Sequence, residues 1–186
     1  MKKLNEMRIE KRLTSSFRIT TMITSVAAIA AILVLLIISN RYTYALRYFG
    51  FAQGDIGQAI ILFTDARGDT RAIVGYDDQS VISNLVSQFD EDKEGFTSQW
   101  KEVEAVLVTD ETKSTYQTIN NKLQDYWALN EEIIELGKTV SDKAGRQQAQ
   151  SKAMNELAPA YEEIESLMYE LFNTKTSRGE SLDNNL

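Results

Sequence analysis

The sequence predicts an all-α fold, an antiparallel up-down-up-down four-helix bundle whose first helix is continuous with an N-terminal transmembrane helix. Three observations predict it. The 186 residues contain one proline and nine glycines, so few positions interrupt a helix. A long run near the N-terminus carries no charge. Beyond that run, apolar residues recur at alternating spacings of three and four, which places them on one face of a helix.

The charge-free run predicts a transmembrane helix over residues 20–39. It lies within ITTMITSVAAIAAILVLLIISN, which is long enough to cross a hydrocarbon core of ~30 Å as a helix. Six basic and two acidic residues precede it in a tip over residues 1–19, and the rest of the chain is acidic. The positive-inside rule therefore predicts a cytoplasmic N-terminus in the inner or plasma membrane, with residues 40–186 outside the cytoplasm.

A cleaved signal peptide is the alternative interpretation of this run. Its apolar core would span only ~7–15 residues and would end at a small-residue cleavage site. The run here is longer and ends in LLIISNRYTY, which has no such site. We therefore expect an uncleaved anchor, with the lipid bilayer as one partner of the chain.

Four helices are expected in the extracytoplasmic region, over about 40–75, 78–108, 110–141 and 142–186. The links between them are short, which makes neighbouring helices antiparallel. Gly75 ends the first helix in this prediction, and Asp77 or Asp78 caps the second. The fourth helix then returns to the membrane near Leu186, so we expect a fragment that ends before a second transmembrane helix.

Pro159 falls well inside the fourth predicted helix. Proline lacks a backbone N–H and its ring crowds the preceding turn, so it should bend the helix locally. Two interpretations stay open, a tolerated surface kink and a functional hinge.

The chain contains neither histidine nor cysteine, which weakens every enzymatic interpretation. The commonest general base and metal ligand is missing, and so are a thiol nucleophile and a thiolate metal site. We expect no enzyme activity, no catalytic residues, no metal and no cofactor. Nucleic-acid binding is not expected either, because an acidic body would be repelled by phosphates.

Two arginines occupy the apolar stripe of the first bundle helix. Arg67 takes a stripe position, and Arg71 follows one turn later. Folding the helices into register brings Asn130, Met154 and Asn155 level with Arg67, near the membrane-distal end of the bundle. The candidate ligand-binding residues are therefore Arg67, Arg71, Asn130, Asn155, Tyr126 and Tyr161.

A buried guanidinium without a partner is costly, which leaves two interpretations of these arginines. In the first, they hold a small anion, because arginine binds a carboxylate through two parallel hydrogen bonds. In the second, Arg67 forms an intrahelical ion pair with Asp65 or Asp69, or reaches solvent with its stem buried.

The whole layout resembles a known family. The stretches FRITTMITSVAAIAAILVLLII and DARGDTRAIVGYDD, with the basic tip before them and the helical body around them, resemble the N-terminal sensor region of methyl-accepting chemotaxis proteins. The likeness is to the class with a four-helix-bundle ligand-binding domain. It implies a homodimer that binds a small molecule, such as an amino acid or an organic acid, near its distal end. Arg67 and Arg71 are the matching positions.

The resemblance also implies how such a sensor works. Ligand binding shifts the fourth helix along its axis, and this displacement reaches cytoplasmic signalling proteins through a kinase-controlling domain. The alternatives are the same sensor fold on a histidine kinase or a cyclic-dinucleotide enzyme, and a ligand-free, membrane-anchored bundle that binds a partner protein.

Overall fold

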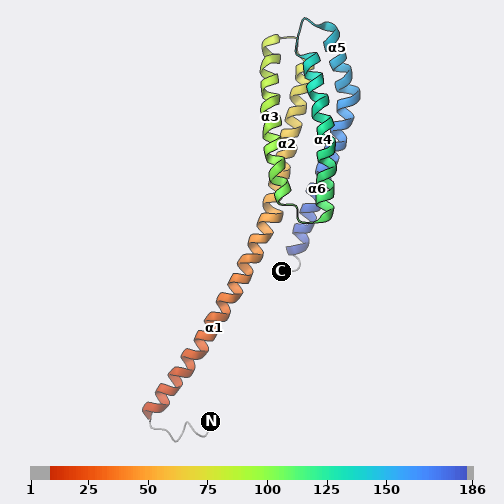
Figure 1. Ribbon diagram of the computed structural model, residues 1–186. Helices are drawn as coiled ribbons and strands as arrows, with labels where there is room; N and C mark the ends of the chain where they lie inside the picture. Colours follow the sequence, from red (N-terminus) through yellow and green to blue (C-terminus); the bar gives the residue numbers. More distant parts are fainter. Residues whose placement is uncertain (1–8, 184–186) are drawn as a thin grey trace. The chain divides into compact units, whose positions relative to one another are not determined.

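The computed structural model describes residues 9–183, and its side chains at residue 9 and residues 11–177 (Figure 1). The chain divides into two compact units, Met1–Tyr44 and Ala45–Leu186. The described residues are helical apart from short links, and no strand occurs among them. The predicted all-α class is therefore confirmed.

Apart from its last residue, α1 (Ile9–Ala45) belongs to the first unit. The helical stretch Lys11–Gly75, which includes α1 from Lys11 onward, contains a segment long and apolar enough to cross a membrane, and none of that segment is buried. No other described helix passes the same test. Apolar side chains such as Leu33 and Leu36 remain more than half exposed, as expected for a surface that faces lipid. α1 is a candidate membrane span.

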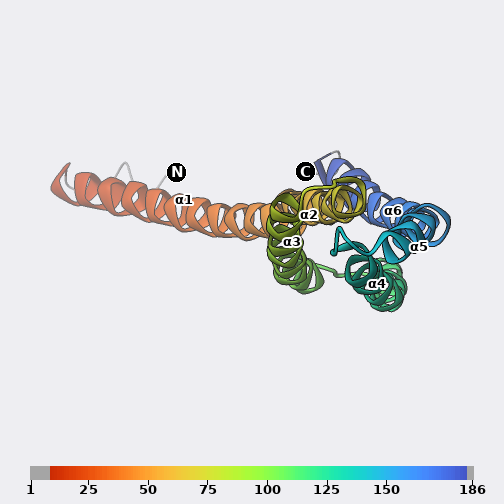
Figure 2. The ribbon, with the colours of Figure 1, turned by 90° about the horizontal axis from the view of Figure 1, so that it is seen from above.

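The second unit is a four-helix bundle, in which η denotes a π-helical turn (Figures 1 and 2). Its elements are η2 (Leu46–Gly50), α2 (Phe51–Gly75), α3 (Gln79–Ala105), α4 (Asp110–Gly137), α5 (Lys143–Lys152), η3 (Ala153–Leu157) and α6 (Ala158–Asp183). α5, η3 and α6 follow one another directly and form the fourth helix. The links α2–α3 and α4–α5 lie at one end of the bundle, and the link α3–α4 lies at the other.

Side-chain caps define where the bundle helices begin. Asp78 accepts hydrogen bonds from the N–H groups of Ser80 and Val81, at 2.8 and 3.3 Å. Thr109 caps α4 and Asp142 caps α5 in the same way. These acceptors satisfy N–H groups that have no partner within the helix.

Two helices end earlier than the sequence suggests. α3 stops at Ala105 and α4 stops at Gly137, so the link before α5 is longer than expected. Gln79 stabilises this link, because its side chain donates to the carbonyl of Lys138 and accepts from the N–H of Val140. A long-range contact of this kind replaces the hydrogen bonds that another helical turn would have made.

The fourth helix changes its hydrogen-bond pattern just before Pro159. In η3 the N–H of Ala158 donates to the carbonyl of Ala153, five residues back instead of four. Pro159 offers no N–H to the carbonyl of Asn155, and its ring crowds that carbonyl. The widened turn accommodates both effects. The local distortion predicted at Pro159 therefore takes the form of a π turn, and its role as a hinge stays a prediction.

The core of the bundle is centred on one phenylalanine. Phe63 of α2 is fully buried, and its ring lies 4.8–5.8 Å from those of Phe96 in α3, Tyr126 and Trp127 in α4, and Tyr161 in the fourth helix. One α2 side chain thus contacts all three other helices. Aromatic pairs at these separations add favourable energy to that of the buried area.

Gly137 provides a test of how closely α2 and α4 approach. A Cβ atom at this position would lie 2.9 Å from Cγ1 of Val74 and 3.4 Å from Cβ of Ala149. We expect Gly137→Ala to lower the free energy of unfolding by about 1–3 kcal/mol, because the core must shift to admit it. Urea unfolding followed by circular dichroism measures this change.

Gly57→Ala is the matched control, since no atom lies within 4 Å of a Cβ added there. In the middle of α2 the same substitution should raise stability by about 0.5–1 kcal/mol. Equal effects of the two substitutions would contradict the close approach at Gly137.

Candidate ligand-binding site

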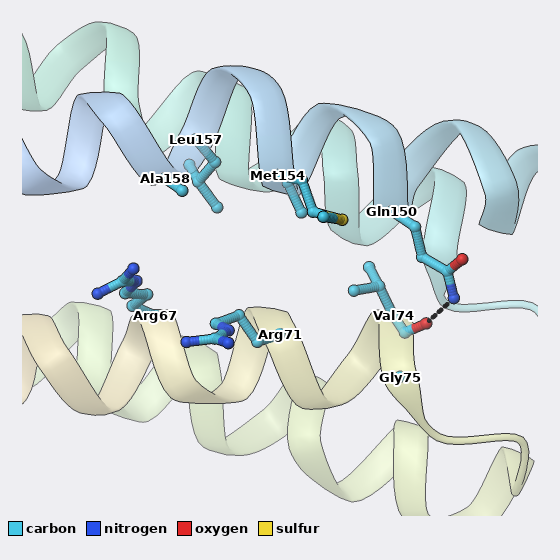
Figure 3. A pocket seen from close by; sticks show the side chains of 9 residues that line it. Arg67, Arg71, Val74, Gly75, Gln150, Met154, Leu157 and Ala158 are labelled. Atoms are coloured by element: carbon cyan, nitrogen blue, oxygen red, sulfur yellow. Dashed lines mark hydrogen bonds between the residues drawn. The ribbon is translucent and has the colours of Figure 1, made fainter.

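A cavity of about 370 Å³ lies between α2 and the fourth helix, at the end of the bundle where α2 meets α3 (Figure 3). The α2 side is formed by two arginines and the last residues of the helix, and the opposite side includes three residues of the π turn. The lining consists of Arg67, Arg71, Val74, Gly75, Gln150, Ala153, Met154, Leu157 and Ala158. A space of this size suits a small molecule.

Arg67 is held in place by an aromatic ring. Its guanidinium carbon lies 3.8 Å from the centroid of the Tyr161 ring, a cation–π contact. The Tyr161 hydroxyl donates to Glu165 Oε1 at 2.5 Å and lies 2.9 Å from Thr64 Oγ1. Burial, followed by the hydrogen bond to Glu165, raises the pKa of Tyr161, so the phenol stays protonated. The half-buried Arg67 is therefore oriented by a fixed neutral ring.

Neither arginine of the cavity has an acidic partner among the described residues. Among the described residues, no carboxylate oxygen lies within 4 Å of a guanidinium nitrogen of Arg67 or Arg71, and the Arg71 side chain is exposed. The intrahelical ion pair of Arg67 with Asp65 or Asp69 is thus wrong, whereas the other part of that interpretation, an Arg67 that reaches solvent with its stem buried, stays a prediction. Residues two apart on a helix point to different faces, which prevents that pairing.

Asp69 instead faces α3. It is 8% exposed, and the carboxyl groups of Asp69 and Asp92 are close enough to affect each other's pKa. Burial first, and then the negative charge of Asp92, raise the pKa of Asp69 from 3.8 to about 6. Burial likewise raises the pKa of Asp92. α2 therefore carries its arginines on one face and a proton-binding carboxyl on another.

The predicted site residues do not all come together. Arg67 and Arg71 line the cavity, and Tyr161 contacts Arg67 without being part of the lining. Asn155 is exposed outside the lining, where it donates to Ser151 Oγ at 3.2 Å. Its neighbour Met154 lines the cavity, and adjacent helical residues point about 100° apart.

Asn130 and Tyr126 belong to the packed interior instead of the cavity lining. Asn130 is fully buried, accepts from Thr70 Oγ1 at 2.8 Å and donates to the carbonyl of Tyr126 at 3.0 Å. The Tyr126 ring packs on Phe63. Their contacts join α2 to α4, because a buried amide must find hydrogen-bond partners within the core.

Arg146 of α5 is a structural position beside the cavity that sequence reasoning did not find. It is 6% exposed and donates to the carbonyls of Ile73 and Val74 at 3.3 Å, Tyr76 at 2.5 Å and Gly137 at 2.7 Å. These carbonyls belong to the ends of α2 and α4 and the link after α2. They are groups for which a helix end provides no N–H partner.

Gln150, one turn after Arg146, donates to the carbonyl of Val74 at 2.8 Å (Figure 3). Arg146 and Gln150 thus fix the end of α2 against α5, directly beside the cavity. In the sequence they look like ordinary polar residues of an exposed helix, and no local signal separates them from their neighbours.

Comparison with known families identifies the class of protein. Residues 6–186 match the model of the four helix bundle sensory module for signal transduction, and the chain belongs to this family. The predicted sensor-domain class is confirmed by this match. Comparison with curated proteins and with solved structures gave no significant match.

Replacement of Arg146 tests its role at the helix ends. Arg146→Met should lower the free energy of unfolding by about 3 kcal/mol, because buried carbonyls lose charge-assisted hydrogen bonds. Lys143→Met, at an exposed position of the same helix, is the control and should change stability by less than about 0.5 kcal/mol. Urea unfolding separates the two outcomes, and a small effect of Arg146→Met would refute the proposed contacts.

The carboxyl pair predicts a pH dependence of stability. The folded chain keeps a proton on Asp69 up to pH about 6, whereas the unfolded chain releases it near 3.8. Folding therefore binds a proton between these values, and the contribution of Asp69 to stability falls as pH rises through this window.

Asp69→Asn removes this titration and keeps a polar side chain of nearly the same size. We expect the variant to be more stable than the parent at neutral pH, with the difference shrinking as pH falls toward 4. Thermal unfolding at a series of pH values measures this. Asp90→Asn, on the exposed side of α3, is the charge control. A difference between the Asp69 variant and the parent that does not change with pH would contradict the assignment.

Proposed function

We propose that this chain is the sensor region of a transmembrane chemoreceptor of the methyl-accepting type, and that it detects a small anionic solute outside the cytoplasm. The main observation in support of the proposal is the cavity, because Arg67 and Arg71 line it and form no ion pair with a described residue. Two unpaired guanidinium groups favour an anion such as a carboxylate. Membership in a sensory family supports a non-enzymatic role.

The position of the cavity supports a mechanism of signal transmission. It joins α2 to the π turn of the fourth helix, so a bound ligand contacts both elements. A ligand that prefers one packing of these elements by ~1–3 kcal/mol shifts the equilibrium between two states of the bundle. In this proposal α6 moves along its axis, and the movement reaches cytoplasmic signalling proteins across the membrane.

We further propose that the chain works as a homodimer in the inner or plasma membrane, with its N-terminus in the cytoplasm. Phe51 and Ile61 of α2 are 65% and 54% exposed, and a second copy of the chain would cover them. The basic residues before α1 and the acidic region after it support the orientation.

A ligand screen tests the proposed function. The chain is reconstituted in lipid nanodiscs, and its thermal unfolding is followed by the fluorescence of Trp100 and Trp127. We expect at least one compound from a panel of monocarboxylates, dicarboxylates and amino acids to raise the unfolding temperature, because binding to the folded state stabilises it. Arg67→Ala and Arg71→Ala should each weaken that binding by about tenfold or more.

Lys101→Ala removes an exposed positive charge from α3 and is the control. Binding that survives in both arginine variants would reject this site. A panel without any binding compound would instead favour a bundle that binds a partner protein and no small ligand.

A further inference from the structure

The cavity has a cationic side and an apolar side. In Figure 3 the guanidinium groups of Arg67 and Arg71 lie on the α2 side, and the apolar side chains of Leu157, Ala158 and Met154 lie across the cavity from α2. The other end of the cavity, where α2 stops, holds Val74, Gly75 and the amide of Gln150. A ligand that fits this arrangement has one charged end and an apolar remainder.

The cationic side suits a carboxylate. Arg67 and Arg71 are one helical turn apart and line the same cavity, so both guanidinium groups reach one bound anion. The contact with the Tyr161 ring, 3.8 Å from the guanidinium carbon to the ring centroid, holds the Arg67 side chain in place. A guanidinium held in one orientation can donate two parallel hydrogen bonds to the two oxygens of a carboxylate.

The rest of the cavity suits an aliphatic body. Val74 and Leu157 are buried there, whereas Met154 is 75% exposed although it lines the cavity. An apolar ligand would cover Met154 and remove its side chain from water, which is favourable. The flexible thioether of methionine adapts to ligands of different shape.

An α-ammonium group does not fit this arrangement. In an amino acid the ammonium lies one carbon away from the carboxylate, and so beside the guanidinium groups of Arg67 and Arg71, which repel it. None of the described residues that line the cavity is acidic. The amide of Gln150 lies at the Gly75 end in Figure 3 and donates to the carbonyl of Val74. A buried ammonium without a partner is costly.

We propose that this cavity binds aliphatic monocarboxylates and discriminates against α-amino acids with the same carbon skeleton. The inference rests on the proposed function, because it names the ligand class of that site. The discrimination comes from two arginines without ion-pair partners among the described residues, on one side of a cavity whose remaining side chains are mostly apolar.

Three compounds of nearly the same shape test the inference, isocaproate, leucine and isocaproamide. Leucine adds an α-ammonium to isocaproate, and isocaproamide replaces its carboxylate by a neutral amide. Isothermal titration of the chain in nanodiscs near neutral pH gives the dissociation constants. We expect isocaproate to bind at least about tenfold more tightly than either of the other two.

Two variants locate the carboxylate. Arg71→Gln changes an exposed side chain that has no ion pair among the described residues, so the variant should fold, and it should weaken isocaproate binding by about tenfold. Lys101→Gln removes one exposed charge from α3 and should leave the affinity unchanged. Circular dichroism checks that both variants are helical.

The outcomes separate this inference from the proposed function. Leucine binding as tightly as isocaproate, with both weakened by Arg71→Gln, overturns the discrimination and leaves the anion site in place. Isocaproamide binding as tightly as isocaproate overturns the role of the carboxylate. If isocaproate does not bind while a dicarboxylate or an amino acid of the panel does, the ligand class is wrong and the sensor function stands. If no compound binds, both proposals fail.

Discussion

The packing of Phe63 is the interaction on which the arrangement of the bundle depends. Its ring contacts aromatic side chains of all three other helices, and one of these, Tyr161, also contacts the guanidinium of Arg67. Phe63 and Tyr161 stack nearly parallel, 8° apart, at 5.0 Å. The position of the cavity arginine is thus linked to the centre of the core through one shared ring, because closely packed interiors transmit displacements from one side chain to the next.

A second constraint acts at the two ends of the bundle, where helices stop and leave carbonyl groups without partners. At each end, a buried cationic side chain donates hydrogen bonds to backbone carbonyls. Arg146 binds the carbonyls at the ends of α2 and α4, and Lys175, 1% exposed, donates to the carbonyls of Val106 and Tyr48 at 2.6 and 3.3 Å. Both cations come from the fourth helix. That helix is therefore held at both ends of the bundle, and the π turn between them faces the cavity.

The different faces of α2 explain how one short stretch, DARGDTR, serves several purposes. Arg67 and Arg71 face the fourth helix, Asp69 faces α3, and Thr70 reaches Asn130 of α4. The helical period separates charges that are close in the sequence, so the arginines keep no acidic neighbour on their own face. This separation leaves Arg67 and Arg71 without an ion-pair partner among the described residues, which is the property that the proposed anion site requires.

The sequence by itself determined the helical class, the apolar N-terminal helix, the cap at Asp78 and the two arginines of the cavity, because periodicity, charge and capping act between residues close along the chain. It could not place Asn155 and Asn130, since the π turn before Pro159 changes which residues of the fourth helix face α2, and Asn130 finds its partner sixty residues away. The contacts of Arg146 could not be predicted from the sequence either. Its acceptors Ile73 and Gly137 lie on two other helices, and only the folded bundle brings those carbonyls to one guanidinium.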